Sequence, residues 1–261
     1  MNGERAQDWL REVCIEAARQ AGRHALDQRH RRGDVHQRFA HDIKLKLDHE
    51  CQETAMRVIL GHFPGDSVLG EEWTTARGGD APEWIVDPID GTVNFFHGLS
   101  WWCSSVAVRH RGRVVAGAVY APEVDQLFDA MADGPARLNG ETIRIESRVG
   151  LADALVITGS EKELEPGALP LATAQRFAPH VQKIRILGAA AIDICQVASG
   201  AADLFVQHGL YLWDVAAAAL IVERAGGVVD IEPTRQEGRY SCLACAHGGL
   251  RRAVTAAGLD S

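Results

Sequence analysis

The order of apolar segments along the chain constrains the fold more than any other feature. Residues 4–31 and 48–62 carry apolar side chains at intervals of three and four, which predicts two helices. Short apolar segments between residues 67 and 130 are separated by turns and predict strands. From residue 154 the pattern alternates between strand and helix. The sequence therefore predicts an α/β protein, with an α+β half followed by an α/β half.

The two expected halves meet in a polar stretch, residues 144–153. We divide the chain there into an N-terminal α+β subdomain, residues 1–148, and a C-terminal α/β subdomain, residues 149–261. In the second subdomain, strands are predicted at 154–158, 183–187 and 203–207, and helices at 169–178, 189–199 and 213–224. The strict alternation over residues 42–48 predicts a strand or hairpin, and Asn139-Gly140 favours a tight hairpin turn.

Composition limits the class of protein. The chain has 261 residues, a formal net charge of -8 and 46% hydrophobic residues, so it can bury a large core. The acidic balance argues against a nucleic acid or an anionic membrane as partner. The longest apolar run, residues 215–222, is shorter than the roughly 20 residues that a bilayer requires. The charged N-terminus lacks the apolar stretch of a secretory signal, so we expect a cytoplasmic location.

One cysteine pair has the spacing of a redox or zinc motif. Cys242 and Cys245 are followed by His247. A structural zinc site needs a second pair of ligands at matching spacing, and the sequence has none. We therefore interpret residues 241–246 as a buried strand of small residues.

The segment Asp87-Pro-Ile-Asp-Gly-Thr92 carries the clearest chemical signal. Pro88 favours extended geometry at Asp87, so we expect the strand 84–86 to end with a carboxylate at its tip. Asp90 follows closely enough to share an ion with Asp87. Thr92 can open a short helix, 92–96, whose free N–H groups favour a phosphate. Carboxylates beside an anion site require cations between them, which favours Mg²⁺.

Other acidic residues also lie at the ends of expected elements. Glu71 and Glu72 follow an apolar strand, and Asp214 opens a helix. Each could be a turn, a cap or a solvated residue. Together, three acidic elements at such edges predict one shared cation site, because loops and termini converge there in layered α/β proteins.

Three segments resemble the inositol monophosphatase family: Gly70-Glu-Glu72, Trp84 to Phe95, and Trp213 to Gly227. The resemblance covers nearly the whole chain in order and spacing. It implies a layered, alternating α-β-α-β-α sandwich of the sugar-phosphatase type. It also implies a Mg²⁺-dependent, lithium-sensitive phosphatase, and it suggests a homodimer.

The resemblance implies a ligand set for two to three Mg²⁺ ions. Glu71, Asp87 and the carbonyl of Ile89 would hold the first ion. Asp87, Asp90 and Asp214 would hold the second, so Asp90→Asn should cripple turnover. A third, weaker ion would lie near Glu71 and bind through waters.

The same resemblance implies roles in catalysis. Gly91 and Thr92 would donate backbone N–H groups to the phosphate. Thr92 and Glu71 would orient or deprotonate the attacking water. Asp48 would accept a hydrogen bond from the Thr92 hydroxyl.

The substrate pocket departs from the family pattern. Besides Asp214, it would include Gln207, where inositol-specific members have a Glu that binds ring hydroxyls. It would also include Gly188, Ala189 and Ala190, in a loop with one hydroxyl fewer than usual. A mobile-loop lysine is replaced by Gln37. Lys44 or Lys46 could take its place, although the alternation there fits a half-exposed strand equally well.

These features predict hydrolysis of a small phosphate ester, with inositol 1-phosphate as the leading substrate. Alternative substrates are histidinol phosphate, fructose 1,6-bisphosphate and 3′-phosphoadenosine 5′-phosphate. An alternative of another class is a protein that binds RNA polymerase or acts as a partner in ribosome biogenesis, with only vestigial phosphatase activity.

Overall fold

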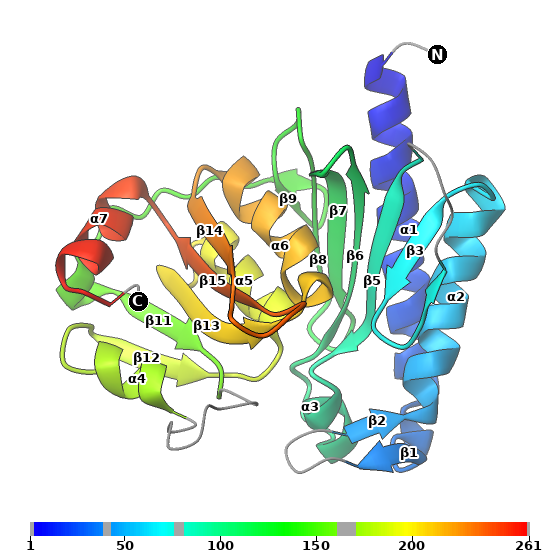
Figure 1. Ribbon diagram of the computed structural model, residues 1–261, viewed down its shortest axis with the longest axis horizontal. Coiled ribbons are helices and arrows are strands. Elements are labelled where there is room, and N and C mark those ends of the chain that lie inside the picture. Colours follow the sequence, from blue (N-terminus) through cyan, green and yellow to red (C-terminus); the bar gives the residue numbers. More distant parts are fainter. Residues whose placement is uncertain (1–2, 39–42, 76–80, 161–170, 260–261) are drawn as a thin grey trace.

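The protein has five alternating layers of helices and sheets (Figure 1). The computed structural model describes residues 3–38, 43–75, 81–160 and 171–259. Helices α1 (Gly3–Asp27) and α2 (Lys46–His62) cover the outer face of a larger sheet. Helices α5 (Ala190–Ser199) and α6 (Leu212–Ala225) lie between this sheet and a smaller one. The expected layered sandwich is confirmed.

The larger sheet contains eight strands within the described part of the chain, in the order β10-β9-β8-β7-β6-β5-β3-β4. All neighbours are antiparallel except β3 and β5. The strands are β3 (Ser67–Gly70), β4 (Thr74–Thr75), β5 (Glu83–Asp90), β6 (Cys103–His110), β7 (Arg113–Ala121), β8 (Gln126–Met131), β9 (Arg137–Leu138) and β10 (Glu141–Thr142).

The smaller sheet has the order β12-β11-β13-β15-β14 among the described residues. Strand β11 runs parallel to β12 and β13, whereas β15 is antiparallel to β13 and β14. The outer face carries α4 (Ala172–Phe177) and α7 (Gly248–Ala256). The strands are β11 (Leu155–Thr158), β12 (Lys183–Ile186), β13 (Leu204–Leu210), β14 (Val228–Pro233) and β15 (Tyr240–Cys245).

Short elements complete the description. Strands β1 (Val35–Arg38) and β2 (Ile43–Leu45) form an antiparallel pair beside the N-terminal half. Helix α3 (Thr92–His97) follows β5. Two 3₁₀ turns are η1 (Arg29–Arg31) and η2 (Leu151–Asp153). The proposed boundary between residues 148 and 149 lies in the segment that joins the two main sheets.

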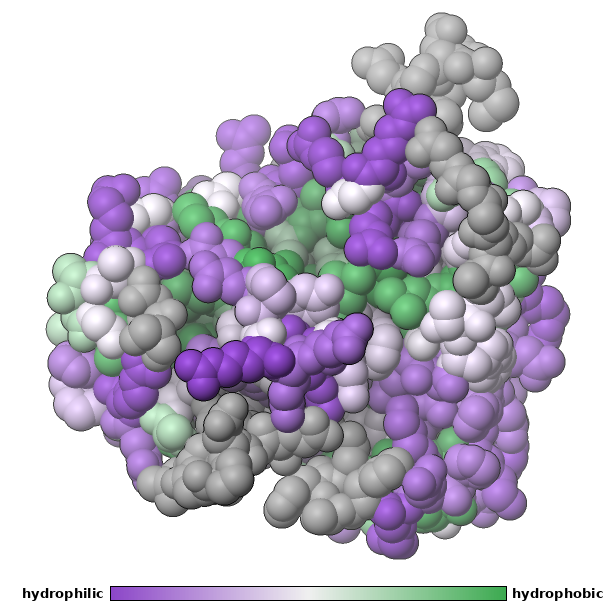
Figure 2. Space-filling model, in the orientation of Figure 1, coloured by the Kyte–Doolittle hydropathy of each residue, from purple (hydrophilic) through white to green (hydrophobic). Residues whose placement is uncertain are grey.

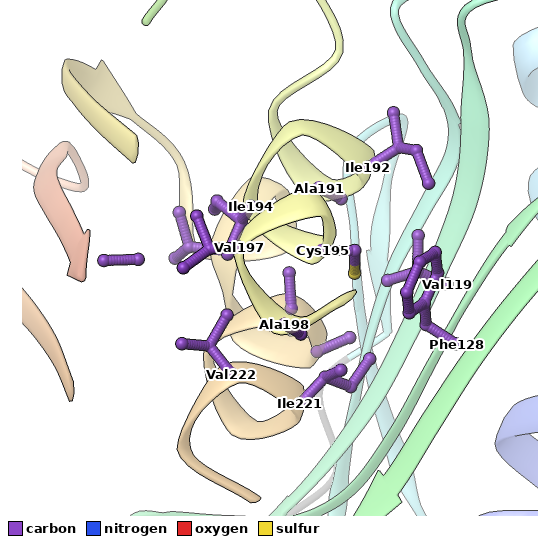
Figure 3. Close-up of a cluster of buried hydrophobic side chains, with 14 of the residues drawn as sticks. Val119, Phe128, Ala191, Ile192, Ile194, Cys195, Val197, Ala198, Ile221 and Val222 are labelled. Atoms are coloured by element: carbon purple, nitrogen blue, oxygen red, sulfur yellow. The ribbon is translucent and has the colours of Figure 1, made fainter. Parts of the chain in front are cut away.

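Helix α5 carries mostly apolar side chains on both faces because both faces are covered. Figure 3 shows Ile192 and Cys195 pointing toward Val119 and Phe128 of the larger sheet, while Val197 points to the opposite side. A helix that is hydrophobic all round is stable in water only when it is buried in this way. The core therefore joins both sheets through one helical layer.

Helix α6 lies very close to β7. A Cβ added at Gly117 of β7 would lie 2.9 Å from Cα of Ala217. Because both positions are small, the helix packs directly against the strand backbone. This contact fixes the distance between α6 and the larger sheet, and with it the position of Asp214 in the first turn of the helix.

The structure confirms the strand interpretation of residues 241–246. Cys242 packs in the core between the two sheets, whereas Cys245 packs on the outer face with α4 and α7. The two thiols therefore lie on opposite faces of β15 and do not form one metal site. The ring of His247 caps α7 by accepting from the backbone N–H of Leu250.

Some boundaries differ from the sequence expectation. Strand β5 does not end at Val86 but continues to Asp90, and α2 begins at Lys46 rather than Asp48. Strand β14 and helix α7 were not predicted. The hairpin at Asn139-Gly140 is confirmed, with φ of 51° and 86° at these two residues.

Apolar side chains on the face shown in Figure 2 gather toward the middle, with hydrophilic side chains around them. Within the described residues, every helix is too short or too polar to cross a bilayer.

Candidate active site

Three carboxylates from opposite halves of the chain converge between the sheets. Asp87 and Asp90 lie at the end of β5, and Asp214 lies in the first turn of α6. Each offers an oxygen, and these oxygens lie within 4.8 Å of one another. Among the described residues, no other group of three or more His, Cys, Asp or Glu side chains is arranged in this way. The expected meeting of these three residues is therefore observed.

The end of β5 is shaped by an irregular register. A bulge between Asp87 and Asp90 interrupts the pairing with β6. Strand β3 ends opposite Val86, so it offers no acceptor for a backbone N–H at position 88. The lack of an N–H at Pro88 therefore costs no hydrogen bond between strands on that side. The Pro88 carbonyl accepts from the hydroxyl of Ser104 at 2.6 Å. This explains why the strand continues through the proline and presents both carboxylates.

The neighbouring carboxylates destabilise the charged form of Asp87. Burial raises the pKa of Asp87 well above its usual value, and the charges of Glu71, Asp90 and Asp214 raise it further. Its Oδ1 is buried and has no hydrogen-bond partner. Burial also raises the pKa of Asp90 to about 7. A divalent cation would supply the missing partner and relieve the repulsion, so the donor set fits a hard metal ion such as Mg²⁺.

Asp90 also holds the start of α5. Its carboxylate accepts from the backbone N–H groups of Ala190 at 3.1 Å and Ala191 at 2.7 Å. The predicted pocket residues Gly188, Ala189 and Ala190 therefore lie beside the carboxylate group. This contact links the α5 loop to the cation site.

Asp48 and Asp214 occupy equivalent positions in two different helices. Each is the third residue of its helix and accepts from the preceding N-cap N–H, Leu45 at 2.6 Å and Tyr211 at 2.8 Å. Oδ1 of Asp48 is buried without a partner. Burial, followed by the charges of Glu71 and Glu72, raises the pKa of Asp48.

The prediction that Asp48 accepts a hydrogen bond from the Thr92 hydroxyl is wrong. The Thr92 hydroxyl donates instead to the carbonyl of Ile89 at 2.9 Å. This bond forms because Thr92 is the first residue of α3 and faces back toward the preceding carbonyl. Its neighbour Gly91 has φ of 88°, a left-handed conformation that glycine adopts most easily. A Cβ there would also lie 2.9 Å from Cβ of Ala189.

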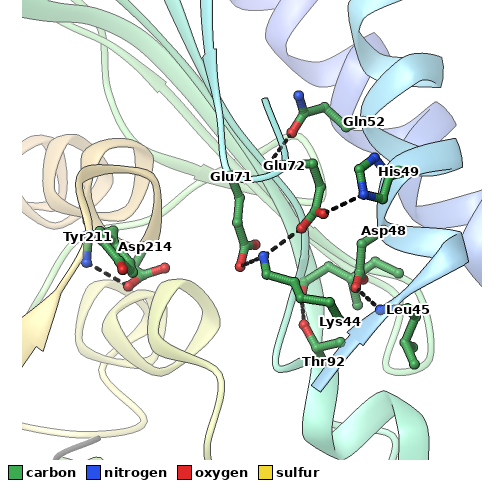
Figure 4. A network of polar contacts seen from close by, with 11 residues as sticks. Lys44, Leu45, Asp48, His49, Gln52, Glu71, Glu72, Thr92, Tyr211 and Asp214 are labelled. Carbon is green, nitrogen blue, oxygen red and sulfur yellow. Dashed lines mark hydrogen bonds and ion pairs between the residues drawn. The ribbon is translucent and has the colours of Figure 1, made fainter. Parts of the chain in front are cut away.

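Glu71 and Glu72 are joined by a lysine (Figure 4). Nζ of Lys44 lies 2.5 Å from Oε1 of Glu71 and 2.5 Å from Oε1 of Glu72. Lys46 is exposed at the start of α2 instead. Of the two candidate lysines, Lys44 is therefore the one that faces the acidic residues.

Gln207 lies in β13 and is half-buried. A Cβ added at Gly159 would clash with its side-chain amide. The side-chain amide of Gln207, the predicted pocket residue, therefore lies directly beside Gly159, which follows β11.

Several contacts around the site were not predicted. The indole of Trp101 donates to Asp193 at 2.6 Å, and Asn94 Nδ2 donates to the carbonyls of Trp101 and Leu187, both at 2.7 Å. These bonds hold α3 and the α5 loop together. Two of these bonds join positions more than 90 residues apart. Polar residues in apolar segments, such as Asp193 in α5, were the available signal.

Comparisons with known proteins agree with this geometry. The model of the inositol monophosphatase family matches residues 6–256. Inositol monophosphatase 2 of Solanum lycopersicum is 36% identical and covers 87% of this chain and 88% of its own. The Nus factor SuhB of Pasteurella multocida is 33% identical, with 83% of each chain covered. The crystal structure of the extragenic suppressor protein suhB from Bartonella henselae has a TM-score of 0.85 at 30% identity, covering 94% of this chain and 96% of that chain.

Proposed function

Because the chain belongs to the inositol monophosphatase family, a family of phosphatases, we propose that it hydrolyses a small polyol phosphate monoester, with inositol 1-phosphate as the leading substrate. The observation that carries this proposal is the convergence of Asp87, Asp90 and Asp214 within 4.8 Å. Carboxylates at this separation, two of them buried, repel one another unless a cation lies between them.

Mg²⁺ is the proposed cofactor, in two to three ions. Asp87, Asp90 and Asp214 would hold one ion, and Glu71, Asp87 and the Ile89 carbonyl would hold another. When bound, Mg²⁺ lowers the pKa of a coordinated water and neutralises charge on the phosphate ester. The unpartnered Oδ1 of Asp87 supports this assignment.

The chain's own groups would position the reactants. The Thr92 hydroxyl donates to Ile89, so its oxygen lone pairs remain able to accept a hydrogen bond from the attacking water. Glu71 would accept the proton of that water through the oxygen that Lys44 does not contact. The backbone N–H groups of Gly91 and Thr92, at the start of α3, would bind phosphate oxygens. Asp48 does not orient Thr92 in this proposal, because the Thr92 hydroxyl donates to Ile89.

The alcohol half of the substrate would contact the second subdomain. Gly188, Ala189, Ala190 and Asp214 lie at or beside the carboxylate group, and Gln207 would complete the pocket. A neutral Gln binds hydroxyls less strongly than a charged Glu. We therefore expect broader substrate acceptance than a Glu at this position would give. The expected homodimer and cytoplasmic location remain predictions.

Phosphate release tests the proposal. Inositol 1-phosphate would be incubated with and without Mg²⁺, alongside fructose 1,6-bisphosphate, histidinol phosphate and 3′-phosphoadenosine 5′-phosphate. We expect Mg²⁺-dependent release that lithium inhibits and that Asp214→Asn abolishes. Asp230→Asn is the matched control, because Asp230 pairs with Arg251 outside the carboxylate group. A folded protein that releases no phosphate from any of these esters would contradict the proposal.

A second candidate function is binding to the transcription machinery, favoured by the similarity to a relative named a Nus factor. Clustered buried carboxylates are costly to retain without a cation, which disfavours vestigial activity. Purified RNA polymerase that binds this protein equally well with or without Asp214→Asn would support the second function as independent of the first.

A further inference from the structure

The end of β13 is irregular just before Asp214. The register between β13 and β15 shifts between Gln207 and Leu210. Such a bulge takes backbone groups out of the ladder and bends the strand. Within it, Gly209 has φ of 77°, a left-handed conformation that glycine adopts most easily. The segment that leads from β13 to Asp214 therefore needs contacts other than strand pairing to fix its position.

Arg239, just before β15, supplies two such contacts. Its Nη1 donates to the carbonyl of Gly209 at 2.6 Å, and its guanidinium carbon lies 3.6 Å from the centre of the Tyr211 ring. The residue is only 9% exposed, and a cation over an aromatic ring is held more strongly when it is desolvated. One buried side chain thus joins the bulge in β13 to the residue that precedes α6.

Tyr211 carries this contact to the proposed metal ligand. It is the N-cap residue of α6, and its backbone N–H donates to Oδ2 of Asp214 at 2.8 Å (Figure 4). Its ring also stacks on Trp213, with ring centres 4.5 Å apart and planes at 22°. At these distances Arg239 and Trp213 must cover opposite faces of the Tyr211 ring. The ring is held from both sides, so the N–H stays aligned with the carboxylate.

We propose that Arg239 is a positioning residue for metal binding: through Tyr211 it holds the carboxylate of Asp214 in the orientation that binds Mg²⁺. This inference rests on the proposed function, in which Asp214 is a metal ligand. Groups that orient a ligating side chain are worth roughly 10–100-fold in metal affinity. Arg239 contributes in this way without touching the ion.

Arg239→Met tests the inference, since methionine keeps an unbranched side chain and removes the guanidinium. Arg235→Met is the matched control, because it removes the same charge from an exposed position in the same connection between β14 and β15. Mn²⁺ would serve as the probe, with unbound Mn²⁺ counted by its electron paramagnetic resonance signal in the absence of substrate. Circular dichroism would check that each variant is folded at the assay temperature.

We expect Arg239→Met to bind Mn²⁺ about tenfold more weakly or worse, and Arg235→Met to bind it as the wild-type protein does. In phosphate release, Arg239→Met should need more Mg²⁺ for its half-maximal rate. Its kcat at saturating Mg²⁺ should fall less than this requirement rises, because the ligands themselves are unchanged. If Arg239→Met does not fold, Arg239→Gln replaces it with the same expected result.

Tyr211→Leu tests the route of the effect, because it removes the ring and keeps the backbone N–H. If Arg239 acts through the ring, the two substitutions are coupled and their effects do not add. Arg239→Met introduced into Tyr211→Leu should therefore weaken Mn²⁺ binding by less than about twofold.

Three outcomes would overturn the inference. Unchanged Mn²⁺ binding by Arg239→Met would show that the guanidinium does not position Asp214. Equal weakening by Arg235→Met would show a general effect of charge. A full tenfold loss in the Tyr211→Leu background would show that Arg239 does not act through Tyr211. All three differ from failure of the proposed function, in which the wild-type protein itself would bind no Mn²⁺.

Discussion

Gly117→Ala tests how closely α6 must pack against β7. The new Cβ would lie 2.9 Å from Cα and 3.0 Å from Cβ of Ala217, whereas ordinary contacts begin at 3.4 Å. The strand and the helix would have to separate by about half an ångström in a close-packed interior. We expect such overpacking to lower the free energy of unfolding by about 1–3 kcal/mol.

Thermal unfolding followed by circular dichroism measures this effect. For a chain of this size, a loss of 1 kcal/mol lowers Tm by roughly 2–4 °C, so the expected decrease is roughly 2–12 °C. Gly61→Ala is the matched control, because it makes the same change in α2 where no atom lies within 4 Å. That variant should be unchanged or more stable by about 0.4–1 kcal/mol.

Activity gives a second readout of the same displacement. Ala217 lies one turn after Asp214 in α6, so moving the helix also moves a proposed metal ligand. Because a 1 Å misplacement costs about 100-fold in rate, we expect Gly117→Ala to lower kcat severalfold at saturating Mg²⁺. If Gly117→Ala matched Gly61→Ala in both Tm and kcat, the packing argument would be refuted.

Three further predictions concern the metal, a buried acid and a buried indole. Mg²⁺ should raise Tm of the wild-type protein, because it binds only the folded site, and Asp87→Asn should shrink that rise in a thermal-shift titration. Burial raises the pKa of Asp193 to about 7 from an ordinary value of 3.8, so its contribution to stability is complete below pH 3.8 and lost as the pH rises to about 7. Asp193→Asn should therefore become progressively more stable relative to wild type across this range in pH-dependent denaturation; a constant difference would contradict this. Trp84→Phe should lower the free energy of unfolding by about 1–3 kcal/mol or more in urea, because it removes the indole N–H that donates to the buried carboxylate of Asp66 at 2.9 Å in the wild-type protein. An unchanged urea midpoint would contradict this.

The residue pattern was sufficient for an α+β half followed by an α/β half and for a shared site of acidic residues, whereas the layered sandwich was implied by the resemblance to the inositol monophosphatase family. Helix and strand periods differ sharply in this chain. Asp90 and Asp214 lie at the ends of their elements and Asp87 lies three residues before the end of β5, where layered folds bring side chains together. Their convergence therefore follows from local pattern and general topology, whereas their catalytic and metal-binding roles remain proposals.

The sequence did not predict contacts that depend on register and rotamer. Whether Lys44 or Lys46 faces the glutamates depends on where β2 ends and α2 begins, and boundaries are the least certain part of a pattern-based prediction. The acceptor to which the Thr92 hydroxyl donates depended on the local turn after Ile89. Strand β14 was missed because its residues are only partly buried and lack a strong alternating pattern.

The division of the carboxylate group between two halves of the chain has a consequence for biosynthesis. A nascent chain that has emerged only as far as β5 carries Asp87 and Asp90 but lacks α6, so it presents an incomplete binding site. The third proposed ligand, Asp214, lies in α6, which begins at Leu212, so the three carboxylates can meet only when about the last fifth of the polypeptide has emerged and docked. Mg²⁺ would then stabilise the newly made protein once α6 has docked, and it would not stabilise shorter nascent chains.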